Sequence, residues 1–153
     1  MSLFDTQLER GKVGEAIVKR YFEQQGVELR DTRDDEEFWK EDVDFVMADG
    51  LKYEVKTDYR FADTGNLAIE YGITNFYGYK DSWLTTSKAD YFCFVNPFQP
   101  DRFACISAED LRHLCETENF RKALCRDYQR EVHLYLLPFK DYEDAFSIYY
   151  LDD

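Results

Sequence analysis

Three ionisable residues in the first third of the chain have the types and spacing that phosphodiester hydrolysis requires. Asp44 precedes an Asp-Gly turn signal, and Glu54 and Lys56 follow that turn with one residue between them. Two carboxylates held close together are costly unless a cation neutralises them, and Mg²⁺ binds through one or two carboxylates, waters and substrate phosphate. A lysine beside the metal can orient or deprotonate the attacking water, and the metal lowers the pKa of that water. The pattern therefore predicts a site for Mg²⁺, or for Mn²⁺ in its place, that hydrolyses phosphodiester bonds.

A β-hairpin is the element that must bring these residues together. Residues 43–47 and 51–57 are short alternating runs on either side of the turn at Asp49-Gly50, which is a strong hairpin signal. Side chains alternate between the two faces of a strand, so Glu54 and Lys56 share one face. We therefore expect the hairpin to place Asp44 near them.

A helix over residues 5–25 is predicted to add a fourth site residue. Its apolar positions have helical spacing, and Glu15 lies on the side of Val18 and Phe22, which faces the sheet. Glycine is unfavourable inside a helix, so Gly11 and Gly14 make sense where the helix must approach another backbone or a ligand closely. Glu15 could then reach the metal directly or through a water.

The remaining pattern predicts a single α/β domain over residues 1–153, with a central mixed β-sheet flanked by helices. The further elements expected are strands at 67–71, 91–95, 102–106 and 133–137, a short helix or turn at 86–90 and a helix at 107–117. Three segments have no clear period: the charged residues 28–42, read as a loop or an edge, the glycine- and aromatic-rich residues 72–83, and the tail from residue 140.

The charge of the chain opposes a nucleic-acid partner. Asp and Glu outnumber Lys and Arg by 32 to 19, and the resulting field repels polyanions at long range. This leaves open a rival function, a non-catalytic protein of the same fold that binds proteins or mimics nucleic acid. No apolar run is long enough to span a membrane, and the four cysteines form no C-x-x-C pair. These features predict a cytoplasmic protein with reduced thiols and no membrane partner.

The ordered set Gly14-Glu15, Asp44 and Glu54-Val55-Lys56-Thr57 resembles the PD-(D/E)XK nuclease superfamily, in particular its Holliday-junction-resolvase-like and phage-type endonuclease branch. The resemblance covers residues 11–58 and departs from the motif at Val43, where the family often has proline. It implies a restriction-endonuclease-like core, DNA as the substrate, and a homodimer. It also implies roles for single residues: Asp44, Glu54 and the Val55 carbonyl would hold Mg²⁺, Lys56 would serve the attacking water, and Glu15 would be the additional helix carboxylate.

Three other acidic residues are alternatives or additions to this set. Asp42 has the same strand parity as Asp44 and could be the ligand in its place. Asp58 is read as a solvated charge at the strand end. Glu70 either faces the site as an outer carboxylate or points to solvent.

Several basic and aromatic residues are candidates for contacts with nucleic acid. Arg60, Lys80 and Lys88 are expected to form a strip that faces phosphates near the site. The aromatic side chains in residues 71–83 could stack on unpaired bases or could pack in the core, and Phe38 and Trp39 raise the same question. A second basic run, which either contacts nucleic acid or forms salt bridges on a helix surface, comprises Arg121, Lys122, Arg126 and Arg130.

Overall fold

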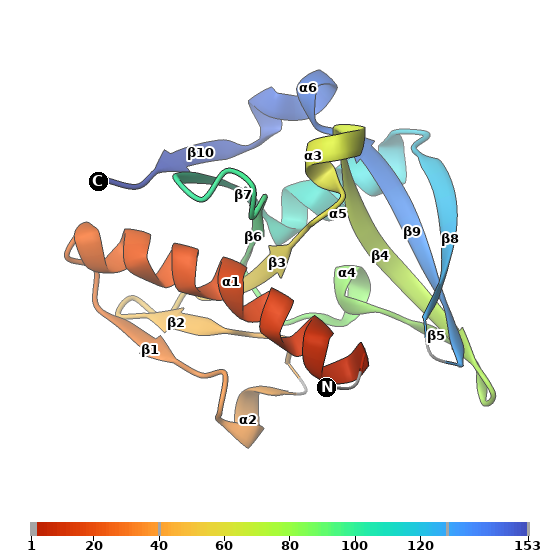
Figure 1. The fold of residues 1–153 in the computed structure, drawn as a ribbon, viewed down its shortest axis with the longest axis horizontal. Helices are drawn as coiled ribbons and strands as arrows, with labels where there is room; N and C mark the ends of the chain where they lie inside the picture. Colours follow the sequence, from red (N-terminus) through yellow and green to blue (C-terminus); the bar gives the residue numbers. More distant parts are fainter. Residues whose placement is uncertain (1–2, 40, 128, 153) are drawn as a thin grey trace.

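The computed structural model describes residues 3–39, 41–127 and 129–152 and contains two β-sheets with helices packed around them (Figure 1). Sheet A has the strand order β1-β2-β3-β6-β7-β10, and sheet B has the order β5-β4-β9-β8. Strands β3 and β6 pair in parallel, whereas the other paired strands in the described part of the chain are antiparallel. The predicted central mixed sheet is therefore confirmed.

The strands of sheet A are β1 (Leu29–Asp31), β2 (Phe45–Met47), β3 (Lys52–Thr57), β6 (Tyr91–Val95), β7 (Arg102–Ser107) and β10 (Ser147–Tyr150). Those of sheet B are β4 (Asn66–Asn75), β5 (Gly78–Asp81), β8 (Arg121–Asp127) and β9 (Arg130–Pro138). The helices are α1 (Leu3–Gln24), α2 (Glu36–Trp39), α3 (Phe61–Thr64), α4 (Trp83–Thr86), α5 (Ala108–Thr117), α6 (Phe139–Tyr142) and the 3₁₀ turn η1 (Glu143–Ala145).

Helix α1 covers one face of sheet A. Val18 and Phe22 on its apolar side are buried against Phe45, Val55 and other apolar residues of the sheet. The helix ends before Gly26, which has a φ of 70° and lets the Val27 N–H turn back to the Phe22 carbonyl at 2.9 Å.

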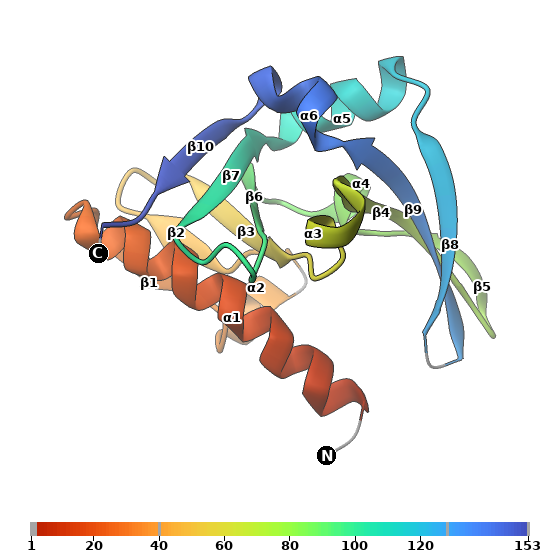
Figure 2. The same cartoon turned by 45° about the horizontal axis from the view of Figure 1, so that its top comes forward.

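The opposite face of sheet A packs against sheet B, α4 and α5. Phe92 and Ile106 from sheet A meet Ile69 and Leu137 from sheet B in one buried cluster, which Leu111 of α5 completes. In Figure 2 the strands of sheet B curve away from sheet A toward the turn between β8 and β9. Sheet A is thus enclosed between a helix and a second sheet, because both of its faces are apolar. No helix in the described residues is long and apolar enough to cross a membrane.

The predicted hairpin is present with the predicted turn. Phe45 pairs with Tyr53 and Val46 with Lys52, and Gly50 at the turn has a φ of 90°, which favours glycine.

The structure differs from the sequence-based prediction in sheet B. Strand β4 runs on to Asn75 instead of ending at Tyr71, because it pairs with β9 and β5 beyond a register shift between Glu70 and Gly72. A bulge of this kind inverts the alternation of side chains, which removed the period-2 signal from residues 72–75. Residues 121–127 form a strand and not a helix surface, since β9 provides a long antiparallel partner. The short helix lies at Trp83–Thr86, before the predicted position, and residues 28–42 contain β1 and α2.

The two glycines inside α1 should respond oppositely to substitution by alanine. A Cβ atom on Gly14 would lie 2.0 Å from Thr57 Oγ1 and 3.3 Å from Val95 Cβ, whereas a Cβ on Gly11 would meet nothing within 4 Å. The predicted close approach is therefore present at Gly14, against side chains of β3 and β6, and is wrong for Gly11. We expect Gly14→Ala to lower the free energy of unfolding by about 1–3 kcal/mol through overpacking. Gly11→Ala should raise it by about 0.5–1 kcal/mol through helix propensity. Urea denaturation of both variants checks this, and equal effects would contradict the packing described for α1.

Candidate active site

The site lies where β2 separates from β3. The Asp44 N–H donates to the Tyr53 carbonyl at 2.9 Å as the last main-chain contact at this end of the ladder. One step further along β3, the Val55 N–H has no strand opposite it and donates instead to Asp44 Oδ2 at 2.8 Å. The Asp44 side chain thus lies at the open edge of the sheet, where residues from both faces can approach it.

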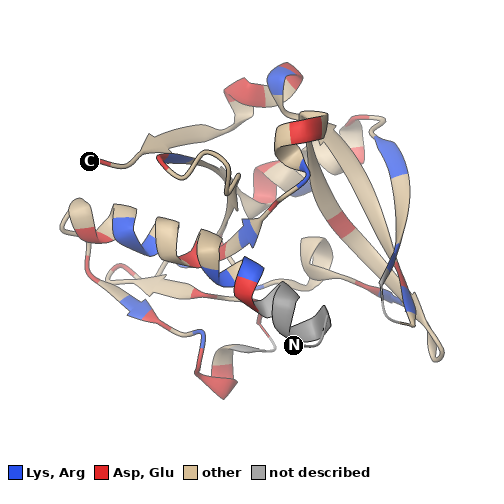
Figure 3. Cartoon of the chain, in the orientation of Figure 1, with Lys and Arg blue, Asp and Glu red and all other residues tan. Residues whose placement is uncertain are grey.

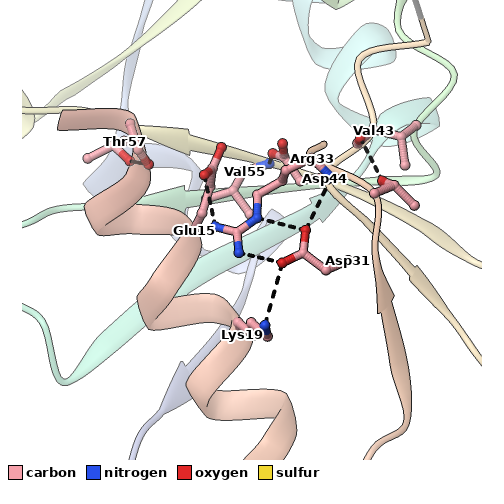
Figure 4. A network of polar contacts seen from close by, with 10 residues as sticks. Glu15, Lys19, Asp31, Arg33, Val43, Asp44, Val55 and Thr57 are labelled. Carbon is pink, nitrogen blue, oxygen red and sulfur yellow. Dashed lines mark hydrogen bonds and ion pairs between the residues drawn. The ribbon is translucent and has the colours of Figure 1, made fainter. Parts of the chain in front are cut away.

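The position of Asp44 is maintained by the segment that follows β1. Thr32 is fully buried; its hydroxyl donates to the Val43 carbonyl at 2.9 Å, and its N–H donates to the Asp44 carbonyl at 2.9 Å. Figure 4 shows Val43 and Asp44 near the edge of β3. The segment that precedes β2 is therefore held in place by contacts that do not involve the hairpin turn.

Three carboxyl groups meet at this edge. Glu54 on β3 is buried, and Glu15 reaches Asp44 from α1 on the other face of the sheet. Burial and then the charge of Glu54 raise the pKa of Asp44 to about 8. Burial and then the charge of Asp44 raise the pKa of Glu15 to about 7, although the Arg33 guanidinium opposes this change. Burial also raises the pKa of Glu54. These carboxyl groups repel one another and therefore favour a bound cation.

Lys56 lies between Glu54 and an aromatic ring. Its Nζ atom is 3.5 Å from Glu54 Oε1 and 4.6 Å from the centre of the Trp83 ring, and 26% of its side chain is exposed. Burial alone would lower the pKa of Lys56, but the neighbouring carboxylates, Glu54 first, outweigh burial and raise it. The lysine is therefore held as an ammonium group that is partly open to solvent.

Arg33 joins Glu15 to an outer ion-pair network that sequence reasoning missed. Its Nη1 donates to Glu15 Oε2 at 3.1 Å and its Nε to Asp31 Oδ1 at 2.8 Å, as drawn in Figure 4. The hydrogen bond from Arg33 lowers the pKa of Asp31 to about 2, because it outweighs the opposing effect of burial. Lys19 lies 3.5 Å from the same carboxylate. Residues 28–42 carry many charges, but no spacing in the sequence connects Arg33 to a helix 18 residues earlier.

The donor set fits a hard divalent cation in its chemistry. Asp44, which immediately precedes β2 (the strand was predicted to begin at residue 43), and Glu54 on β3 could supply oxygen ligands. Tyr53 and Val55 have the same strand parity, so the Val55 carbonyl, like that of Tyr53, points to the open edge where Asp44 lies. Within the described residues no group of three or more His, Cys, Asp or Glu side chains has the arrangement of a metal site. Mg²⁺ does not need one, because waters and substrate phosphates complete its octahedron.

The chain shares its fold with an endonuclease. A bacterial homing endonuclease of known structure, I-Ssp6803I, is similar over 82% of this chain and 75% of its own, with a TM-score of 0.53. The two sequences are 16% identical, so the similarity concerns the fold. The chain matches no protein-family model and no curated protein.

The other acidic candidates have different environments. Asp42 has a φ of 53° and contributes charge to both Glu54 and Lys56, so it remains an alternative or additional ligand. Asp58 accepts hydrogen bonds from the N–H groups of Arg60, Phe61 and Ala68, so it joins β3 to β4 and is not a solvated strand-end charge. Glu70 accepts a hydrogen bond from Ser82 and contributes charge to Lys56. Glu70 is therefore near enough to the site to be an outer carboxylate.

The three basic residues expected to form one strip lie on separate parts of the fold. Arg60 follows the C-terminal end of β3 and Lys88 precedes β6, close to the start of β3, since the Asp90 N–H bonds to the Lys52 carbonyl. Lys80 lies on β5, in the other sheet. No described contact connects the three side chains.

The aromatic candidates divide into two groups. Trp83 and Phe38 are buried, and Tyr71 packs against Tyr135 with ring centres 4.3 Å apart. Phe76, Tyr77 and Tyr79 are exposed. The side chain of Trp39 lies outside the described residues.

Proposed function

We propose that the protein is a metal-dependent nuclease of the PD-(D/E)XK type that hydrolyses DNA phosphodiester bonds, as resolvases and phage endonucleases do. The observation that carries this proposal is the hydrogen bond from the Val55 N–H to Asp44 at the point where β2 leaves β3. It brings the acidic residue of the first strand to the edge that carries Glu54 and Lys56. The shared fold with a homing endonuclease supports the same class of activity.

The residues divide the work between binding the metal and orienting the water. Asp44, Glu54 and the Val55 carbonyl would hold Mg²⁺, and Glu15 would contact it directly or through a water. The bound metal supplies a water of lowered pKa and stabilises charge on the phosphate oxygens. Lys56 donates hydrogen bonds to the water that attacks phosphorus, while Trp83 and Glu54 fix the direction of its ammonium group. The phosphorus–oxygen bond to the leaving strand end then breaks, leaving a phosphate monoester and a hydroxyl.

Metal binding should depend on the paired carboxylates. We expect calorimetric titration of Mn²⁺ into the wild-type protein to show one site, and Glu54→Gln to weaken it at least tenfold. Glu41→Gln is the matched control, because Glu41 pairs with Lys52 on the same sheet away from the proposed ligands. If Glu54→Gln bound Mn²⁺ as tightly as the wild type, these carboxylates would not be the ligands.

The net charge of −13 favours a second candidate, a non-catalytic nuclease-fold protein that binds a basic protein through its acidic surface. Such a protein would form a salt-sensitive complex that survives Asp44→Ala, and failure to recover any protein partner would exclude it. The homodimer implied by the family resemblance stays a prediction, and a monomeric mass by light scattering would contradict it.

A further inference from the structure

The turns at one end of sheet B form a surface that the proposed catalytic residues do not use. Strands β4 and β9 pair up to Thr74 and Glu131, so residues 75–78 between β4 and β5 lie at the same end of the sheet as the described residues where β8 meets β9, which are 126–127 and 129–130 (Figure 1). We call the surface formed by these residues the paired turns. The hollow between them is lined by Thr74, Asn75, Arg126, Gln129, Arg130 and Glu131.

Two aromatic rings at the paired turns have almost no contact with the protein. Phe76 is 93% exposed and Tyr77 is 92% exposed, with ring centres 5.4 Å apart in an edge-to-face arrangement. The Tyr77 N–H donates to Asn75 Oδ1 at 2.8 Å, and Gly78 has a φ of 104°, so the turn has a defined conformation. Packing in the core does not account for these rings, which are presented to solvent by an ordered turn.

The paired turns carry no excess of acid, although acids predominate in the whole chain. Where β8 meets β9, Arg126 and Arg130 are balanced by Asp127 and Glu131, and Arg121 and Lys122 lie at the other end of β8, opposite Leu136 and Tyr135. The Arg126 side chain is 82% exposed, and its ion pair with Glu131 at 3.7 Å is long. Lys80 and Asp81 are both exposed on the neighbouring strand β5. Figure 3 shows basic and acidic positions close together at this end of sheet B, and a further basic position along β8. The locally balanced charge therefore opposes a polyanion less than the average of this acidic chain does.

Strand β4 connects this surface with the proposed active site. Glu70 is close enough to contribute charge to Lys56, and Asn75 at the start of the turn follows Glu70 by five residues. An extended strand of that length spans about 17 Å. One strand of duplex DNA rises about 3.4 Å per phosphate and an unpaired strand can extend further, so a strand bound at the site would reach the turns within about five nucleotides.

We propose that the paired turns bind DNA with unpaired bases, such as a single strand or the single-stranded arm of a forked duplex, close to the cleaved bond. Phe76 and Tyr77 stack on bases, and Arg126 and Lys80 contact phosphates. Stacking on aromatic rings requires bases that are not already stacked in a duplex, which is why these exposed rings favour unpaired DNA over intact duplex. This inference deepens the proposed function, because it names the substrate class of the nuclease.

Binding in EDTA tests the proposal apart from cleavage. Fluorescence anisotropy would compare a labelled single strand, a duplex with a single-stranded arm and a linear duplex, using the wild type and the double variant Phe76→Ala/Tyr77→Ala. We expect the double variant to bind the single strand and the armed duplex about tenfold more weakly and the linear duplex nearly unchanged. Phe98→Ala, which truncates another exposed ring, should bind like the wild type. Arg126→Gln should weaken all three and reduce the salt dependence by about one phosphate contact.

The outcomes separate this proposal from the proposed function. Unchanged binding by the double variant, with cleavage by the wild type intact, would overturn the role of the paired turns alone. Binding that depends on the turns in a protein that never cleaves would support them while contradicting the nuclease. If the double variant instead lost a dimer in light scattering, or lost binding to phosphatidylserine vesicles while DNA binding was unchanged, the occupant would be a second copy or a membrane and the proposal would be wrong.

Discussion

Replacing Lys56 by alanine is expected to lower the rate of DNA cleavage by about 10²–10⁴-fold while leaving substrate binding nearly unchanged. Lys56 is the cation that the structure holds beside Glu54, with its Nζ between that carboxylate and the Trp83 ring. Its removal takes away the group that orients the attacking water. Single-turnover cleavage of labelled DNA in saturating Mg²⁺ measures this step directly.

The control for this substitution lies on the same strand. Lys52 shares the strand parity of Lys56 but forms its ion pair with Glu41, at 3.1 Å, and not with a proposed metal ligand. Lys52→Ala should cleave within a few-fold of the wild-type rate. Lys56→Met retains the aliphatic stem over Trp83 but has no ammonium group. If Lys56→Ala and Lys56→Met lose cleavage rate equally, the loss is due to the missing ammonium group and not to altered packing. Equal losses in Lys52→Ala and Lys56→Ala would contradict the assignment.

Asp44→Asn should make the metal-free protein more stable at alkaline pH. Burial and then Glu54 raise the pKa of Asp44 from 3.8 to about 8, so the folded state binds a proton that the unfolded state has already released. Stability therefore falls as pH rises from about 4 to about 8, and the asparagine, which has no such proton, avoids the loss. The full change corresponds to about 5–6 kcal/mol. Since three carboxyl groups share the repulsion, we expect a gain of about 3 kcal/mol at pH 8.5.

Chemical denaturation in EDTA at pH 4 and pH 8.5 checks this prediction. The two proteins should be about equally stable at pH 4, and the variant should gain only at the higher pH. Asn Oδ1 can still accept the Val55 N–H, so the substitution preserves the edge contact. Asp49→Asn, at the exposed turn of the hairpin, removes the same charge from the chain and should give little gain. If Asp44→Asn had a lower free energy of unfolding than the wild type at pH 8.5, the ionised Asp44 would stabilise the fold, which would contradict the prediction.

The parts of the site that local sequence determines could be predicted, whereas the parts that depend on distant contacts could not. The Asp49-Gly50 turn sets the register that brings Asp44 to the edge of β3, and helical spacing alone turns Glu15 toward the sheet. Arg33 and Trp83 complete the surroundings of Glu15 and Lys56 through contacts between elements far apart in the chain. No local pattern encodes such pairs.

Sheet B shows the same division. The bulge between Glu70 and Gly72 hid the second half of β4 by inverting its alternation, and β8 became a strand through its pairing with β9. The basic residues of 121–131 therefore lie on a hairpin and not on a helix. The placement of Arg126 and Arg130 at the same end of the sheet as Phe76 and Tyr77 follows from the pairing of β4 with β9, which sequence spacing does not reveal.

The most direct test of the central claim is cleavage by the wild-type protein of a panel of labelled substrates in Mg²⁺, in Mn²⁺ and in EDTA. The panel contains supercoiled plasmid, linear duplex, single strand, four-way junction and RNA. We predict that DNA is cut in either metal, that EDTA abolishes cutting, and that substrates with unpaired bases are cut fastest. A folded protein that cuts none of these substrates with metal present would contradict the nuclease, and its acidic surface would then become the feature that a function must explain.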